Sequence, residues 1–102
     1  MTMPGSENSI TIMFHYIYVL QSLKLLNKVY IGFTNNLQKR LKEHNRSLNF
    51  STKPYMPWQM IFCEAYKNEK DARRREKYLK TNQGARLLKR MLKEYFYEQK
   101  MR

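Results

Sequence analysis

Two short segments rich in aromatic and β-branched residues stand close together near the beginning of the chain. Phe14–Leu20 is apolar on both alternating faces, which is typical of a central strand covered on both sides. Lys28–Phe33 has the same character, and only the polar loop 21–27 separates the two segments. Because so short a connection cannot cross over a sheet, the sequence predicts an antiparallel hairpin as the framework of the fold.

Helical and strand-like segments alternate after this hairpin. The expected elements are, in order, a helix over Leu37–Asn45, a strand over Trp58–Tyr66, a helix from Glu69 or Asp71 to Asn82–Gly84, and a helix over Ala85–Gln99. Thr34, Asn35 and Asn36 offer N-cap side chains to the first helix, and Gly84 is expected to stop the second. The pattern predicts an α+β domain in which helices pack on a small antiparallel sheet.

A length of 102 residues is enough for one domain and not for two. We expect residues 1–12 to form a flexible arm and residues 13–102 to form a single domain. No apolar run approaches the roughly 18–20 residues that span a bilayer, and the start of the chain lacks the pattern of a secretory signal. The single cysteine, Cys63, which we expect to be buried, excludes an intrachain disulfide. These features indicate a cytoplasmic protein.

The net charge of the chain is +12, from 20 basic and 8 acidic residues. A field this strong on a small domain favours a polyanionic partner, with nucleic acid ahead of an anionic membrane. Basic residues are concentrated after Lys67, where the run Arg73–Arg75 lies within an expected helix. The residues that we expect to contact phosphates are Lys39, Arg73, Arg74, Arg75 and Lys80. The alternative is that these charges form a solvated face without a ligand.

The first expected helix carries an arginine and a histidine side by side. At about 100° per residue, Arg40 and His44 fall at the border of the apolar stripe formed by Leu37 and Leu41. Such a pair faces whatever lies above the sheet. The plainer interpretation is that the aliphatic part of Arg40 packs on the helix and that His44 is a satisfied residue at the edge of the core.

A carboxylate takes an unfavourable position on the second expected helix. Glu76 falls next to the only apolar stripe of this helix, where a charge loses part of its hydration and needs a compensating cation. Arg73, Arg75 or a divalent metal ion could supply that cation. The alternative is an i,i+4 ion pair with Lys80, which is a common contact on helix surfaces.

Two tyrosines belong to the expected hairpin. Tyr18 and Tyr30 can be near neighbours across the ladder, where their phenols could hydrogen-bond a water molecule and a phosphate. A tyrosine has an ordinary pKa of about 10, so it needs a nearby cation to act as a base. Gly32, at the end of the second strand, permits close approach by a ligand or a neighbouring element. The alternatives are that the tyrosines only pack and that the glycine marks a bulge or a strand end.

In their order and spacing, these residues resemble the motifs of the GIY-YIG endonuclease superfamily, and in particular its small single-domain members. The matching segments are Tyr16-Ile17-Tyr18, Tyr30-Ile31-Gly32, Thr34, Asn36-Leu37, Arg40-Leu41, His44-Asn45 and Arg75-Glu76. They belong to a resemblance that covers roughly Phe14 to Lys89. In the first motif, Tyr16 stands where the family has glycine.

The resemblance implies a three-stranded antiparallel sheet flanked by helices, and phosphodiester hydrolysis with one divalent ion, Mg²⁺ or Mn²⁺. It implies that Tyr18 or Tyr30, or a water molecule that one of them orients, helps to activate the nucleophile. It further implies that Arg40 binds the scissile phosphate and that Glu76 holds the metal, which polarises the phosphoryl oxygen.

By the same resemblance, His44 would orient a tyrosine, contact the phosphate or share the acid–base work, while Gly32, Thr34 and Asn45 would support the site. These expectations describe a metal-dependent endonuclease that acts on structured or single-stranded DNA in repair or recombination, with RNA left open as a substrate. Its specificity would come from the basic helices or from a partner protein, and a homodimer is left open. The alternative is a nucleic-acid-binding module with a weak or inactive site. A membrane-surface protein is disfavoured because the last helix needs its apolar face to cover the sheet.

Overall fold

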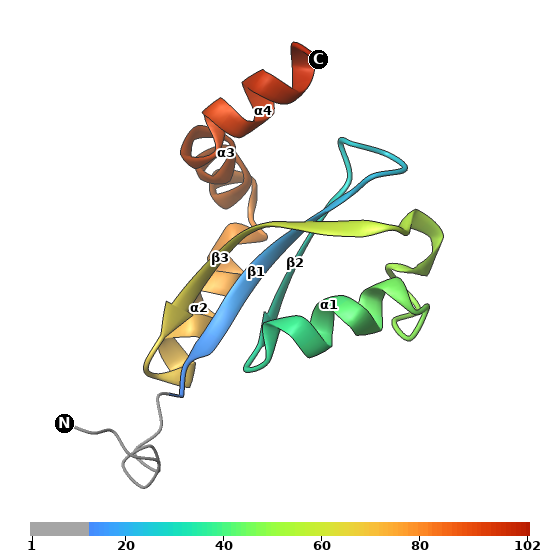
Figure 1. The fold of residues 1–102 in the computed structure, drawn as a ribbon. Helices are drawn as coiled ribbons and strands as arrows, with labels where there is room; N and C mark the ends of the chain where they lie inside the picture. The colour runs from blue at the N-terminus through green and yellow to red at the C-terminus, as the bar shows by residue number, and fades with distance from the viewer. Residues whose placement is uncertain (1–12) are drawn as a thin grey trace, which may run out of the picture.

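The structure, a computed structural model, describes residues 13–102 (Figure 1). The expected arm of residues 1–12 lies outside the described residues. The elements are, in order, β1 (His15–Ser22), β2 (Val29–Thr34), α1 (Leu37–Asn45), the 3-10 turn η2 (Lys53–Tyr55), β3 (Trp58–Tyr66), α2 (Glu69–Leu79), α3 (Asn82–Met91) and α4 (Lys93–Lys100). No helix of this described part is long and apolar enough to cross a membrane.

The strands form one antiparallel sheet in the order β2-β1-β3, so that β1 is the central strand (Figure 1). This confirms the predicted three-stranded sheet of an α+β fold. Residues 17–20 of β1 are completely buried, because helices or loops cover both faces of the central strand. In the register of the sheet, Tyr18 lies opposite Gly32 on β2 and opposite Cys63 on β3.

Helices pack on both faces of the sheet. Ile17 points to the face that α2 covers, where it packs with Ala72 and Leu79. Tyr18 points to the opposite face, where it shares a cluster with Trp58 and the apolar side of α1. The alternation of neighbouring side chains along β1 therefore places α1 and α2 on different faces of the sheet.

β1 continues through Gln21 and Ser22, beyond the predicted end of the strand. Both side chains are polar and buried, and both are satisfied by hydrogen bonds. Ser22 Oγ donates to the backbone oxygen of Tyr55 at 2.7 Å. Gln21 Oε1 accepts a hydrogen bond from Tyr95 Oη at 2.6 Å, and Gln21 Nε2 donates to Gln99 Oε1 at 2.9 Å. Polar contacts thus attach α4 to the end of β1.

The prediction that Gly84 ends the second helix was wrong. α2 ends at Leu79, and Gly84 lies in the first turn of α3, where its backbone nitrogen donates to the N-cap side chain of Thr81 at 3.0 Å. A Cβ atom at this position would collide with the backbone of Tyr78 and Leu79. The glycine is therefore used for a close approach between the two helices and not for a left-handed turn.

Two further expectations differ from the structure. The predicted helix over 85–99 is divided into α3 and α4 at Leu92, whose φ of −110° and ψ of 26° depart from helical values. Cys63, expected to be buried, is exposed. It lies on the edge strand β3 and points to the same face as Tyr18, at a position where the side chain stays open to solvent.

Candidate active site

The aromatic ring of Tyr18 lies across Gly32, which is its partner on β2. A Cβ atom at Gly32 would lie 2.9 Å from Cε2 of Tyr18 and closer still to its hydroxyl end, a contact that real side chains do not make. The glycine therefore leaves room for the phenol above the sheet. The close approach that the sequence predicted at Gly32 is made by a side chain of the protein itself.

A buried histidine forms a hydrogen bond with this phenol. The distance between Tyr18 Oη and His44 Nε2 is 2.9 Å, and both side chains are completely buried. Because His44 belongs to α1, this bond joins the central strand to the helix. Tyr30 packs on the same imidazole, with 4.9 Å between ring centroids, and its ring centroid lies 6.2 Å from that of Tyr18. The structure thus brings Tyr18, Tyr30 and His44 together.

Arg40 lies one turn before His44 on α1 and directs its guanidinium toward the strands. Its Nη1 donates to the backbone oxygen of Phe33 at 3.4 Å, and its Nε pairs with Glu43 at 2.9 Å. The side chain is 39% exposed. A guanidinium that is held at the sheet and remains open to solvent can bind an anionic oxygen that approaches Tyr18.

Burial shifts the pKa values of two members of this cluster. Burial raises the pKa of Tyr18 above its ordinary value, and Tyr30 adds to the rise, while the Arg40 guanidinium acts in the opposite direction. Burial also lowers the pKa of His44, and the positive charge of Arg40 lowers it further. At neutral pH the site therefore holds a protonated phenol against a neutral imidazole, and the tautomer of the imidazole decides which of the two donates.

Glu76 lies on α2, which packs on the face of the sheet opposite to Tyr18. Its side chain is 16% exposed, and its negative charge is the smallest of the influences on the pKa of Tyr18. Lys80 Nζ lies 3.1 Å from Glu76 Oε2. The i,i+4 ion pair that the sequence left open as an alternative is therefore formed.

Residues 14–91 match the family model of the GIY-YIG catalytic domain. The chain belongs to the GIY-YIG family. A UPF0213 protein of Clostridium perfringens is 33% identical over 92 residues, which cover 85% of this chain and 97% of that protein. The UPF0213 protein YazA of Bacillus subtilis is 34% identical over 87 residues, which cover 84% of this chain and 80% of that protein. A Giardia intestinalis protein named "Structure-specific endonuclease subunit SLX1 homolog" is 39% identical over 49 residues, or 45% of this chain and 14% of that protein.

The GIY-YIG family implies a divalent ion, and Glu76 is the carboxylate that we expected to hold it. No three His, Cys, Asp or Glu side chains come together among residues 13–102. Glu76 would therefore supply a single carboxylate ligand, and water and phosphate oxygens would complete the coordination. Mg²⁺ is commonly bound in this way, through one or two carboxylates and the phosphates of the substrate. Lys80, which binds one oxygen of this carboxylate, would have to give way.

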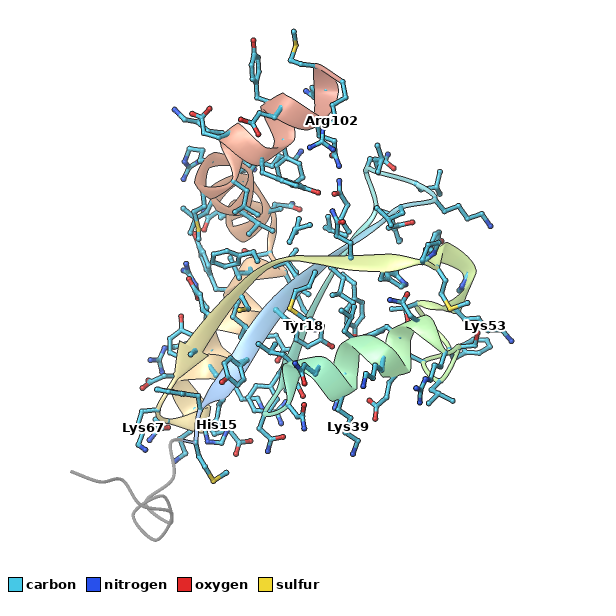
Figure 2. The ribbon with its side chains drawn as sticks, in the orientation of Figure 1. His15, Tyr18, Lys39, Lys53, Lys67 and Arg102 are labelled. Atoms are coloured by element: carbon cyan, nitrogen blue, oxygen red, sulfur yellow. The ribbon has the colours of Figure 1, made fainter. Side chains whose placement is uncertain are left out.

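The arginines expected to bind phosphate each have a carboxylate partner within the GIY-YIG domain. The pairs are Arg73 with Glu69 at 3.3 Å, Arg74 with Asp71 at 2.6 Å, and Arg75 with Glu64 at 3.0 Å. Arg73 also stacks on the Phe33 ring, 3.8 Å from its centroid. Arg75 binds both oxygens of Glu64 on β3, so it helps to hold α2 on the sheet. Lys39 points into solvent from α1 (Figure 2).

Two polar residues expected to support the site hold the two ends of α1. Thr34 Oγ1 accepts a hydrogen bond from the amide of Asn36 at 3.0 Å, and Asn36 Oδ1 caps the helix by accepting from the amide of Lys39 at 3.0 Å. Asn45 pairs with the backbone of Trp58 in both directions, at 2.9 and 2.7 Å. These contacts fix the helix that carries the guanidinium and the imidazole.

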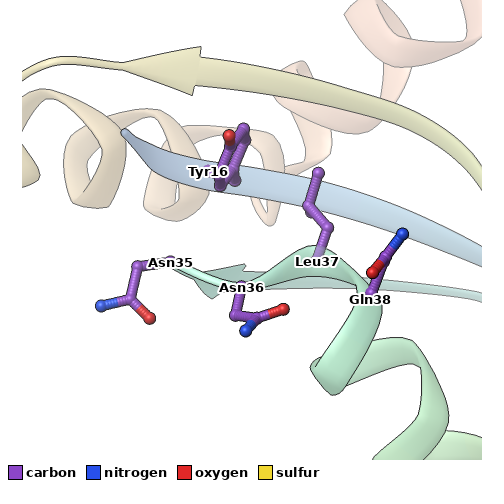
Figure 3. A pocket seen from close by; sticks show the side chains of 5 residues that line it. All are labelled: Tyr16, Asn35, Asn36, Leu37 and Gln38. Carbon is purple, nitrogen blue, oxygen red and sulfur yellow. The ribbon is translucent and has the colours of Figure 1, made fainter. Parts of the chain in front are cut away.

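A shallow pocket of about 270 Å³ opens at the N-terminal end of α1 (Figure 3). Its lining residues are Tyr16, Asn35, Asn36, Leu37 and Gln38. Tyr16 lies two positions before Tyr18 on β1 and points to the same face of the sheet, so the pocket borders the cluster. The residue that replaces the glycine of the first GIY-YIG motif is thus part of the wall of this pocket.

Thr52 is the residue of this site that sequence reasoning missed. It is buried in the loop that follows α1, and its Oγ1 lies 2.8 Å from Nδ1 of His44. A threonine in a polar loop carries no periodic pattern that would indicate an inward-facing side chain. Only the folded path of residues 46–57 brings this hydroxyl to the imidazole.

Proposed function

We propose that this protein is a metal-dependent endonuclease that hydrolyses phosphodiester bonds of DNA. The observation that carries the proposal is the 2.9 Å hydrogen bond between Tyr18 Oη and His44 Nε2, next to the partly exposed guanidinium of Arg40. A phenol with an imidazole acceptor behind it is suited to passing on a proton. A surface that only bound nucleic acid would have no need of such a pair.

In the proposed reaction, the phenol of Tyr18 relays a proton of the attacking water. Tyr18 is completely buried in the free protein, so substrate binding at Arg40 would have to open its hydroxyl to the attacking water. The water would then give a proton to Tyr18 Oη while Tyr18 gives its own proton to Nε2 of His44. The resulting hydroxide oxygen bonds to phosphorus, the bond from phosphorus to the leaving oxygen breaks, and that oxygen takes a proton from solvent. Because burial raises the pKa of Tyr18, a concerted relay is favoured over a stored phenolate.

Arg40 and Glu76 would act on the phosphate, and Tyr30 would act on the imidazole. Arg40 would bind the scissile phosphate and stabilise the negative charge that it gains in the transition state. Glu76 would hold Mg²⁺ or Mn²⁺. When bound, the ion would polarise a phosphoryl oxygen and stabilise the leaving oxygen. Tyr30, whose ring packs on His44, would keep the imidazole aligned with the phenol.

The net charge of +12 supports DNA as the substrate, with RNA as the alternative polyanion. One relative carries the words "structure-specific endonuclease subunit" in its name, and on this basis we extend the proposal to structured DNA in repair or recombination. A partner protein or a second copy of the chain would then add specificity. We place the reaction in the cytoplasm, where the exposed thiol of Cys63 stays reduced.

A DNA-nicking assay tests this function. Supercoiled, flapped and single-stranded DNA are incubated with the protein in Mg²⁺, in Mn²⁺ and in EDTA. We expect metal-dependent cleavage that Glu76→Ala and Arg40→Ala abolish while the circular dichroism spectrum stays native. Lys89→Ala removes an exposed positive charge on α3 and is the matched control. Full cleavage by both site variants would contradict the assignment of the site.

A second candidate function is a nucleic-acid-binding module that does not cleave. The observation that favours it is the ion pair between Lys80 and Glu76. In this pair the ammonium group of Lys80 occupies the carboxylate that would otherwise bind a metal ion. This function predicts DNA binding that weakens steeply with salt and no product with any divalent ion. Gel-shift titrations at several salt concentrations, run beside the nicking assay, separate the two functions.

A further inference from the structure

Thr52 is held in place by its neighbours in the loop between α1 and β3. Its amide donates to Oδ1 of Asn49 at 3.3 Å, and its backbone oxygen accepts a hydrogen bond from Nε1 of Trp58 at 2.9 Å. Trp58 is buried, and its amide donates to Asn45 at the end of α1. The position of the Thr52 hydroxyl is therefore fixed relative to α1.

This hydroxyl contacts the nitrogen of His44 that does not face Tyr18. Thr52 Oγ1 lies 2.8 Å from Nδ1 of His44 and donates to the backbone oxygen of Asn49 at 3.4 Å. A hydroxyl that donates to a carbonyl keeps its lone pairs free, so it can accept the proton on Nδ1. Nε2 then carries no proton and is the acceptor for the Tyr18 hydroxyl.

We propose that Thr52 is a positioning residue that holds His44 in the tautomer with its proton on Nδ1, so that Nε2 stays open to the proton of Tyr18. The consequence for catalysis rests on the proposed function, whereas the tautomer itself does not. In this tautomer, Tyr18 donates to His44, His44 donates to Thr52, and Thr52 donates to the carbonyl of Asn49, over the contacts that the structure shows. When Nε2 takes the phenolic proton, the cationic ring strengthens its bond to Thr52.

The opposite tautomer would break this sequence of donors. If Nε2 carried the proton, Tyr18 Oη would accept it, and the imidazole could take no proton from the phenol. Thr52 would then turn its own proton toward Nδ1 and lose the bond to Asn49. An imidazole in water prefers its proton on Nε2, so the tautomer with the proton on Nδ1 needs an acceptor beside that nitrogen. In this buried pocket the Thr52 oxygen is that acceptor.

Nitrogen-15 NMR of the imidazole ring tests the tautomer directly. The chain has two histidines, His15 and His44, so a His15→Gln background leaves one ring to assign. At neutral pH we expect a protonated Nδ1 and an unprotonated Nε2 with Thr52 present and in Thr52→Ser. Thr52→Val keeps the shape of the side chain, removes the hydroxyl and should shift the ring toward the other tautomer. A proton on Nε2 in the presence of Thr52, or an unchanged spectrum in Thr52→Val, would overturn the proposal.

Cleavage kinetics test the consequence for the reaction. We expect Thr52→Val to lower kcat about tenfold or more with little change in KM, and Thr52→Ser to keep most of the activity. Ser51→Ala is the matched control, because it removes a loop hydrogen bond to Asn49 without contacting His44. An unchanged kcat in Thr52→Val would remove the role of Thr52 in catalysis. If the wild-type protein cleaves nothing, the proposed function fails, and the nitrogen spectrum still decides the tautomer.

Discussion

The phenol of Tyr18 lies across the backbone of Gly32, so β1 and β2 fit together only because β2 has no side chain at that point. The same phenol is hydrogen-bonded to His44 on α1. A contact between two neighbouring strands therefore sets the position of the hydroxyl that we propose as the proton relay.

Alanine at Gly32 should push the Tyr18 ring away from its place. We expect Gly32→Ala to lower the free energy of unfolding by about 1–3 kcal/mol, because the added methyl group overpacks a buried contact. Cleavage should fall as well, because the phenol loses its alignment with His44. Urea denaturation measures the stability. In a Tyr18→Ala background the same substitution should destabilise much less, and an equal loss in both backgrounds would contradict this account.

His44 should make the folded protein sensitive to mild acid. Burial lowers the pKa of His44 in the folded state, so the unfolded chain takes up the proton more readily and stability rises with pH. We expect the free energy of unfolding to fall from about pH 7.5 to about pH 5.5, and to fall less in His44→Gln. An unaltered dependence in His44→Gln would mean that the imidazole is not its source.

Lys80 should compete with a divalent ion for Glu76. An i,i+4 pair of this kind contributes about 0.3–0.5 kcal/mol, which corresponds to about a twofold change in metal affinity. We therefore expect Lys80→Met to lower the Mn²⁺ concentration at half-maximal cleavage by about that factor. Lys77→Met removes a neighbouring charge of the same helix and serves for comparison. A higher Mn²⁺ concentration at half-maximal cleavage in Lys80→Met would contradict this competition and would indicate instead that Lys80 helps to bind the substrate.

A cluster formed by Arg75, Glu64 and Tyr66 holds α2 on β3. Arg75 donates to both oxygens of Glu64, at 3.0 and 3.2 Å, and Tyr66 donates its hydroxyl to Glu64 at 2.6 Å. Burial acts to raise the pKa of Glu64, but the bonds from Arg75 and Tyr66 outweigh it and leave the pKa below its ordinary value. Burial, together with the bond to Glu64, raises the pKa of Tyr66 to about 12.

Neutralising this carboxylate should therefore destabilise the protein at neutral pH. Because the folded pKa of Glu64 is lowered, its contribution is present above the ordinary pKa of a glutamate and is lost as the pH falls through the folded value. We expect Glu64→Gln to lower the free energy of unfolding by about 1–3 kcal/mol at neutral pH and by little near pH ~3. Glu69→Gln, in an exposed pair, should have an effect of less than about 1 kcal/mol. Equal losses at both pH values in Glu64→Gln would rule out the charge as the cause.

Local patterns in the sequence predicted the parts of the site that depend on local geometry. Strand alternation placed Tyr18 and Tyr30 on one face of the sheet. Helical spacing placed Arg40 and His44 side by side on the first helix. The structure brings these four residues together. The roles that we assign to them remain proposals for the experiments above.

The errors came from residues whose surroundings are set by distant parts of the chain. Gly84 could equally end a helix or allow close packing, and only the approach of α3 to Tyr78 distinguishes the two. The phosphate contacts predicted for Arg73–Arg75 stay a prediction, and nothing in the local sequence indicated that Arg75 pairs with Glu64 on another element. Thr52 could not be found because nothing local makes a loop threonine face a histidine eight residues before it.

The residues of the proposed proton relay come from one continuous stretch of chain, whereas the carboxylate proposed to hold the metal ion comes from a later helix. Tyr18, Tyr30, Arg40, His44 and Thr52 follow one another through β1, β2, α1 and the next loop, and Glu76 arrives with α2 on the other face of the sheet. Short connections close at a small entropic penalty. If Glu76 holds the metal ion as proposed, a transient detachment of α2 would weaken metal binding while the hydrogen bond between Tyr18 and His44 stayed in place.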